Sequence, residues 1–141
     1  KVDINQDGKI DVWNTLHPRK NQSPLLVKKE VDVNNDGKPD IWSYYNDAGH
    51  LSEEHFDLDY DSKPDLKEYY QGKKLVSSIV DRNEDEIPDI SRQIRKGSLY
   101  RLKKDTTGDN NQDLWQALDQ GQVEKYCIDV DGDGVIDVRE E

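Results

Sequence analysis

The sequence predicts an all-β fold, a repeat array of about 24-residue β-hairpins arranged as an antiparallel meander or in a solenoid-like way. Three observations support this prediction. The acidic pattern D-x-[DN]-x-D-x-x-x-D begins at intervals of 29, 25, 24, 24 and 24 residues. A run of β-branched and aromatic residues follows each pattern and is too short for a stable helix. A glycine-containing turn then leads to a second short run in most repeats, which is the pattern of a β-hairpin.

The repeats extend over residues 1–141, so the whole chain is predicted to be a single array. They begin near residues 3, 32, 57, 81, 105 and 129. The longer first repeat carries its additional residues in "HPRKNQSP", residues 17–24, which predicts a loop insertion bounded by proline. Apolar residues recur at the start of the first run (Val12, Ile41, Leu66, Ile90, Leu114, Val138), at its end (Leu16, Tyr45, Tyr70, Ile94, Leu118) and after the turn (Leu26, Leu51, Leu75, Leu99, Val123).

Each repeat is predicted to form one hairpin, and the acidic segment links that hairpin to the next. In a meander, the glycine turns then lie along one edge of the sheet and the acidic loops along the other. Because side chains alternate along a strand, Trp13, Trp42 and Trp115 share the face opposite to the residues that start each run. These tryptophans are interpreted either as cross-strand packing in a thin sheet or as a surface for a glycan or a partner sheet.

The composition predicts a domain without a thick hydrophobic core. Only 32% of the residues are apolar, 36% are charged, and the formal net charge is -11. No run of about 18 apolar residues is present, so no membrane span is predicted. Strong acidity also disfavours a nucleic acid as partner. The chain begins at Lys1 and contains no Met, which predicts a processed product or a fragment of a longer protein.

The acidic loops have the composition of cation sites. Side chains with oxygen atoms stand at loop positions 1, 3, 5 and 9, counted from the first Asp of each pattern. On a tightly curled loop these oxygens, with the backbone carbonyl of position 7, converge on one point and suit Ca²⁺ better than Mg²⁺ or Zn²⁺. The sequence therefore predicts several Ca²⁺ ions, up to six. The predicted ligands are Asp3, Asn5, Asp7, Lys9, Asp11; Asp32, Asn34, Asp36, Lys38, Asp40; Asp57, Asp59, Asp61, Lys63, Asp65; Asp81, Asn83, Asp85, Ile87, Asp89; Asp105, Thr107, Asp109, Asn111, Asp113; and Asp129, Asp131, Asp133, Val135, Asp137.

The charge distribution agrees with metal sites in these loops. The ligand positions hold 20 Asp of the 31 acidic residues, and the rest of the chain carries 11 acids against 20 Lys and Arg. Six Ca²⁺ ions would bring the formal charge from -11 to +1. The alternative interpretation is a set of solvated Asx-turn loops that join strands.

Position 6 of the loop is expected to need a positive φ for a sharp turn. Gly8, Gly37 and Gly134 fit this requirement, whereas Ser62 and Glu86 predict backbone strain. Calcium is therefore expected above all at the sites that begin at Asp3, Asp32 and Asp129. The site that begins at Asp105 is expected to be the weakest, because Thr107 removes a carboxylate and position 6 is not glycine.

Two of the loops resemble calcium loops of known families. "DVNNDGKPDIW", from Asp32, resembles the loops of FG-GAP and related bacterial extracellular β-repeat proteins, and "DVDGDGVIDVREE", from Asp129, is similar to thrombospondin type 3 and dockerin-type loops. The resemblance covers about nine residues in each repeat and implies calcium ligands at positions 1, 3, 5 and 9. It implies no overall fold. An EF-hand also needs a bidentate Glu at position 12 and a following helix, and only Glu68 and Glu140 are glutamates at that position.

These features predict a protein that is not an enzyme, since the carboxylates recur six times instead of forming one glycosidase-like centre. The leading hypothesis is an extracellular or cell-surface structural module from a secreted or lipid-anchored parent, because extracellular calcium is millimolar and fills weak sites. A calcium-dependent adhesin or glycan-binding module is the second hypothesis. A fibre-forming protomer is the third, because repeat arrays have open ends. The predicted partners are calcium, copies of the chain, or a surface glycan or protein.

Overall fold

A computed structural model describes residues 1–140, which form eleven β-strands and no helix. The chain divides into two compact units, Lys1–Lys73 and Lys74–Glu141. The first unit contains β1 (Val12–Arg19), β2 (Gln22–Val31), β3 (Ile41–Tyr45), β4 (Leu51–Phe56) and β5 (Leu66–Gln71). The second contains β6 (Lys74–Val80), β7 (Ile90–Arg95), β8 (Ser98–Lys104), β9 (Leu114–Asp119), β10 (Gln122–Ile128) and β11 (Val138–Glu140). Within the described residues, no helix has the length and apolarity needed to cross a membrane.

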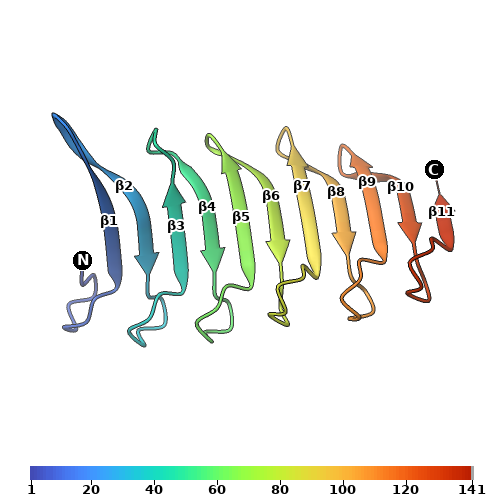
Figure 1. Ribbon diagram of the computed structural model, residues 1–141, viewed down its shortest axis with the longest axis horizontal. Coiled ribbons are helices and arrows are strands. Elements are labelled where there is room, and N and C mark those ends of the chain that lie inside the picture. The colour runs from blue at the N-terminus through green and yellow to red at the C-terminus, as the bar shows by residue number, and fades with distance from the viewer. Residues whose placement is uncertain (141) are drawn as a thin grey trace. The chain divides into compact units, whose positions relative to one another are not determined.

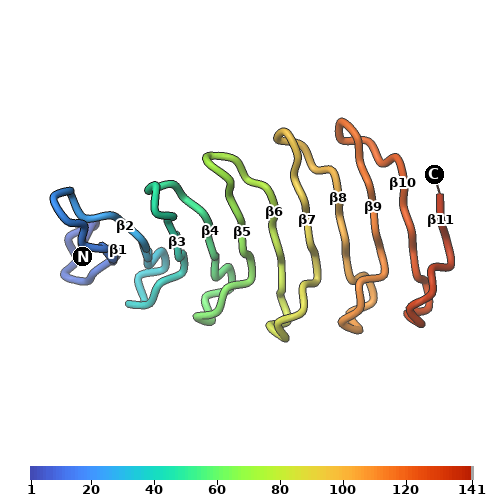
Figure 2. Tube along the Cα trace, turned by 45° about the horizontal axis from the view of Figure 1, so that its top comes forward, coloured from blue at the N-terminus to red at the C-terminus, as the bar shows by residue number. Residues whose placement is uncertain are grey.

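Each unit is an antiparallel meander in which every strand pairs with its neighbours in sequence (Figure 1). Residues on either side of an acidic loop pair directly, as Val31 does with Ile41 and Phe56 with Leu66. In each unit the tight turns lie at one end of the strands and the acidic loops at the other, and Figure 2 shows the same arrangement from another direction. The all-β hairpin meander is therefore confirmed, and the solenoid-like alternative is wrong.

The predicted hairpins close through tight turns. Lys96 and Gly97 join β7 to β8 with φ of 52° and 83°, and Gln120 and Gly121 join β9 to β10 with φ of 49° and 85°. Two residues with positive φ form a type I′ turn, whose twist matches that of the flanking strands. Glycine supplies this conformation without steric cost at the second turn residue.

In the hairpins β1–β2, β3–β4, β7–β8 and β9–β10, the apolar residue that ends the first run pairs with the apolar residue that follows the turn. This register depends on a bulge that the sequence pattern does not show. Ile94 pairs with Leu99, whereas the preceding Gln93 pairs with Arg101, so Tyr100 is an extra residue on β8. Similar shifts occur in the hairpins β1–β2, β3–β4 and β9–β10. Such bulges bend a strand and increase its twist next to the turn.

The loop insertion predicted for residues 17–24 is wrong. These residues lengthen β1 and β2, and only Lys20 and Asn21 form the turn. Pro18 lies at a break in the register of β1, and Pro24 lies in a part of β2 that β3 does not reach, because their pairing starts at Lys28. Both prolines therefore occupy places where a missing N–H interrupts no ladder, so they are compatible with strands.

The interior of the protein is small and unusually acidic. The buried apolar side chains among the described residues are Val12, Leu25 and Val80. More aspartates than apolar residues are buried, and every one of them stands at loop position 1 or 9: Asp11, Asp32, Asp40, Asp57, Asp65, Asp105, Asp113 and Asp129. The predicted absence of a thick hydrophobic core is confirmed, and much of the buried material lies at the acidic-loop ends of the strands.

Candidate metal sites in the six acidic loops

All six acidic loops share one backbone conformation, with positive φ at positions 4 and 6. At position 6, Ser62 (φ 82°) and Glu86 (φ 70°) adopt the same conformation as the glycines, so the predicted strain is present. The positive φ at position 4 was not predicted, and only two glycines signal it in the sequence. Alternating left-handed residues turn successive N–H groups toward the inside of the loop, which creates an anion-binding concavity. The position-4 residues are Gln6, Asn35, Tyr60, Glu84, Gly108 and Gly132.

The position-1 carboxylate fills this concavity. In the second loop, Asp32 Oδ1 accepts the N–H of Asn35 at 2.6 Å and Oδ2 accepts the N–H of Gly37 at 2.7 Å. The same two bonds, from the N–H groups of positions 4 and 6, occur in the other five loops. The first Asp of each pattern therefore holds the curl of its own loop.

The position-9 carboxylate joins the two ends of each loop. Asp40 Oδ2 accepts the N–H groups of Val33 at 2.6 Å and Asn34 at 3.0 Å. A bond from the N–H of position 2 to the Asp at position 9 recurs in every loop. Asp113 is the most buried of these side chains, with 1% of its surface exposed, and it also accepts the Oγ1 hydroxyl of Thr106.

Side chains at positions 3 and 5 lie at the exposed rim of the loop. Asn34 Oδ1 accepts the N–H of Asp36, and Asp36 Oδ1 accepts the N–H of Lys38, so each forms an Asx turn. Most other loops repeat both bonds. Thr107 differs, because its hydroxyl donates to Asp105 Oδ1 at 3.3 Å. The calcium affinity of this loop stays a prediction.

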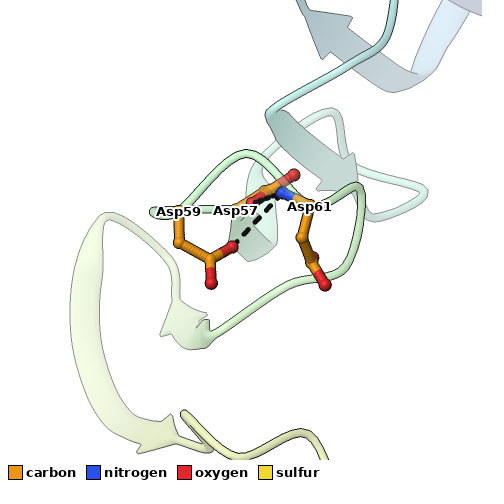
Figure 3. Close-up of side chains that lie close together, drawn as sticks. All are labelled: Asp57, Asp59 and Asp61. Carbon is orange, nitrogen blue, oxygen red and sulfur yellow. Dashed lines mark hydrogen bonds between the residues drawn. The ribbon is translucent and has the colours of Figure 1, made fainter.

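Two loops bring three carboxylates together, and they are the two loops with Asp at position 3. Asp57, Asp59 and Asp61 have oxygen atoms within 4.8 Å of one another (Figure 3). Asp129, Asp131 and Asp137 do the same in the last loop. In Figure 3 the three side chains extend from one curled segment, whose Asp61 N–H donates to both other aspartates. The remaining loops have Asn or Thr at position 3, and in the described residues their three aspartates at positions 1, 5 and 9 do not bring three carboxylates within 4.8 Å of one another.

The buried carboxylates lack cationic partners. No Lys, Arg or His of residues 1–140 forms an ion pair with any of the eight buried aspartates. Backbone N–H groups donate hydrogen bonds to their oxygen atoms instead. At Asp105, burial raises the pKa, but the N–H groups of Gly108, Asn110 and Thr107 outweigh it and keep the pKa below its ordinary value. At the rim, the Asn35 amide and the Lys9 N–H lower the pKa of Asp7.

The donor set fits Ca²⁺. The ligand positions offer only oxygen atoms and no Cys or His, which suits a hard cation and disfavours zinc. An ionised carboxylate has about four lone-pair sites, so two backbone donors still leave acceptor capacity for an ion. Glu68, one of the two glutamates at position 12, lies in β5 and accepts the hydroxyl of Tyr70 instead of closing a loop.

Neighbouring loops contact one another within each unit. Asn35 Nδ2 donates to Asp7 Oδ2 at 2.7 Å, and Lys9 Nζ donates to the carbonyl of Asn35 at 2.9 Å. In the second unit, a Cβ added at Gly132 would lie 2.8 Å from Asp109 Oδ2, so this carboxylate packs against the next loop's backbone. The position-5 side chain of one loop thus contacts position 4 of the next loop. Because position 5 is a predicted calcium ligand, a change at one site alters a contact with the neighbouring loop.

Comparison with known proteins supports a calcium loop at the end of the chain. The family described as EF hand matches residues 126–140. Within this match, the loop lies between β10 and β11, so strands replace the two helices of an EF-hand. No curated protein matches the sequence. The EF-hand match and the converging carboxylates together indicate calcium binding, and they leave the number of ions open.

Gly37→Ala is expected to lower the free energy of unfolding by about 1 kcal/mol, because Ala at a φ of 92° is strained. No atom lies within 4 Å of the added Cβ, so the cost comes from the backbone alone. Urea denaturation in calcium measures the change. Ser62→Ala is the control, since it keeps a side chain at the equivalent position and should change stability little. Equal stability of Gly37→Ala and the wild type would contradict the shared loop conformation.

Proposed function

We propose that this chain is a calcium-stabilised, non-enzymatic structural module of an extracellular or cell-surface protein. The observation that carries the proposal is the repetition of one hydrogen-bond network in all six loops, with position-1 and position-9 carboxylates mostly buried and without cationic partners. Buried charges are costly unless they are paired or coordinate a metal. Calcium supplies the missing positive charge at each loop.

A structural role for the ions follows from the small core. Only three apolar side chains of residues 1–140 are fully buried, so hydrophobic burial stabilises this fold less than it stabilises a domain with a thick core. An ion that binds only the folded loop stabilises the fold, and weak sites would fill at extracellular calcium concentrations. Rigid hairpins then space or present other parts of the parent protein, or join copies of the chain into a fibre. Electron microscopy with and without chelator tests the fibre form.

Calcium titration by calorimetry tests the proposal directly. At least three sites are expected, with the tightest beginning at Asp3, Asp32 and Asp129 and the weakest at Asp105. Asp131→Ala should remove one ion, because it deletes one of three converging carboxylates. Asp119→Ala removes an exposed acid at the end of β9, outside the loops, and should leave the stoichiometry unchanged. No heat of binding at millimolar calcium would refute the proposed function.

A further inference from the structure

Asn35, at position 4 of the second loop, forms hydrogen bonds to predicted ligands of two different calcium sites. Its backbone N–H donates to Asp32 Oδ1 at 2.6 Å, inside its own loop. Its side-chain Nδ2 donates to Asp7 Oδ2 at 2.7 Å, in the first loop. Asp32 is the predicted position-1 ligand of the second site, and Asp7 is the predicted position-5 ligand of the first. One residue therefore connects the two sites without an intervening side chain.

A second contact joins the same two loops. The Lys9 ammonium donates to the backbone carbonyl of Asn35 at 2.9 Å. Lys9 stands at position 7, whose carbonyl is a predicted ligand, and its N–H donates to Asp7 Oδ1 at 2.8 Å. Asn35 Oδ1 is buried and accepts no hydrogen bond within residues 1–140, so the bond from Nδ2 to Asp7 orients this amide. Together these contacts hold position 4 of the second loop against the rim of the first.

The amide link is a property of the first two loops and not of the repeat. The later loops have no side-chain amide at position 4, where they carry Tyr60, Glu84, Gly108 and Gly132. Lys38 of the second loop donates to Ser62 of the third, but this bond ends on a hydroxyl at position 6. Between the fourth and fifth loops, Asn83 Nδ2 donates to Asn110 Oδ1 at 3.3 Å and so reaches an amide instead of a carboxylate. Among the described contacts within each unit, a direct link between ligand carboxylates is therefore specific to the first two sites.

We propose that Asn35 makes calcium binding at the first and second sites positively cooperative. Calcium at the second site fixes Asp32, and Asp32 fixes the backbone of Asn35, so the amide stays where it orients the carboxylate of Asp7. The bond from Asn35 is the largest cause that lowers the pKa of Asp7, so it favours the ionised carboxylate that binds an ion. Coupling between sites is reciprocal, so an ion at the first site also orders Asn35 for the second. This coupling rests on the proposed calcium function and adds the residue that connects two of its sites.

Electrostatics alone would give the opposite sign. Adjacent loops are two strands apart, about 10 Å, and two Ca²⁺ ions at that separation repel each other. With a screening length of about 8 Å at physiological ionic strength, this repulsion weakens the second binding event roughly twofold. The lower end of the usual range of coupling between sites, about fivefold, is enough to outweigh it. The sign of the cooperativity therefore distinguishes an amide link from two sites that interact through charge alone.

Backbone amide signals in NMR spectra separate the three sites of the first unit. The position-6 N–H groups of Gly8, Gly37 and Ser62 donate to the position-1 Asp of their own loops, so each signal reports the filling of one site. Calcium is titrated upward from the lowest concentration at which the wild type stays folded. Asp36→Asn should weaken the second site, and it keeps the oxygen that accepts the Lys38 N–H, so the loop retains its shape.

Asn35→Gly removes the amide link and keeps the loop conformation, because two other loops have glycine at position 4 with φ of 79° and 75°. With Asn35 present, Asp36→Asn should raise the calcium midpoint of the first site about fivefold more than that of the third. In the Asn35→Gly background this excess should disappear. Gln6→Gly is the matched control, since it places glycine at position 4 of the first loop and leaves the link intact, so the excess should persist. Circular dichroism checks that each variant folds.

The third site separates the amide link from a general loss of stability. If Asp36→Asn acts by destabilising the whole unit, the signals of Gly8 and Ser62 will shift to higher calcium by the same factor. Equal shifts in Asp36→Asn alone would overturn the inference, and this comparison remains available if Asn35→Gly does not fold. An excess at the first site that survives Asn35→Gly would overturn it too. No response to calcium at any of the three amides would instead refute the proposed function, whereas three responses without the excess would refute only the coupling.

Discussion

Exhaustive removal of calcium is expected to unfold the chain or to lower its melting temperature sharply. The 20 loop aspartates repel one another, and within residues 1–140 only a thin apolar core opposes that repulsion. At a hundredfold excess of calcium over its dissociation constant, each site stabilises the folded state by about 2.7 kcal/mol. Three sites would contribute about 8 kcal/mol, comparable to the whole stability of a typical domain.

The strand signal in circular dichroism and the melting curve measure the effect. High monovalent salt in the presence of chelator is the control, and it should restore the fold only in part, because it screens repulsion without coordinating the carboxylates. A melting curve that is the same before and after chelation would mean that the loops are ordinary Asx turns, as the alternative interpretation of the sequence has it.

Asp40→Ala is expected to destabilise the first unit more than Asp36→Ala does. Asp40 is 3% exposed, and its loss leaves the N–H groups of Val33 and Asn34 without their acceptor, at a cost of about 2–4 kcal/mol. That cost is present with or without calcium. Asp36 is exposed, so Asp36→Ala should destabilise strongly only when calcium is bound, through the loss of a ligand. Urea denaturation of both variants at saturating calcium, and at the lowest calcium concentration at which the wild type stays folded, separates the two roles.

Hydrogen exchange shows how far each defect spreads. The carbonyl of Asp40 accepts the N–H of Asp57 in the next loop, and neighbouring repeats share their interfaces. In calcium, both variants should therefore reduce protection in the hairpins on either side of the second loop. Protection lost only within residues 32–40 would indicate that each repeat unfolds independently of its neighbours.

The local parts of this fold could be predicted from the sequence. The 24-residue period, the two short runs and the turn at Lys96 and Gly97 specify hairpins, because turn type and strand propensity depend on residues close in the chain. The positive φ at Gly8 and Gly37 could be predicted for the same reason, and Ser62 shows that the loop imposes this conformation even without glycine.

The pairing of strands determined the features of the fold that the sequence pattern did not predict. A meander instead of a solenoid depends on Val31 meeting Ile41 across an acidic loop, a contact that apolar periodicity alone does not select. The pairing of β1 with β2 placed Pro18 and Pro24 in strands, where the composition of "HPRKNQSP" suggested a loop. The bulge at Tyr100 also arises from the pairing of two strands, so neither strand shows it alone.

For the sites, the sequence by itself determined which residues carry oxygen ligands and how they are spaced along the chain. Only the tertiary structure showed that positions 1 and 9 are mostly buried while positions 3 and 5 stay at the rim, because burial depends on where neighbouring loops and strands lie. It also distinguished Trp115 from Trp42. Both occupy the same place in the repeat, but the charges beside them come from other strands, and cross-strand pairing alone brings those charges to the tryptophan.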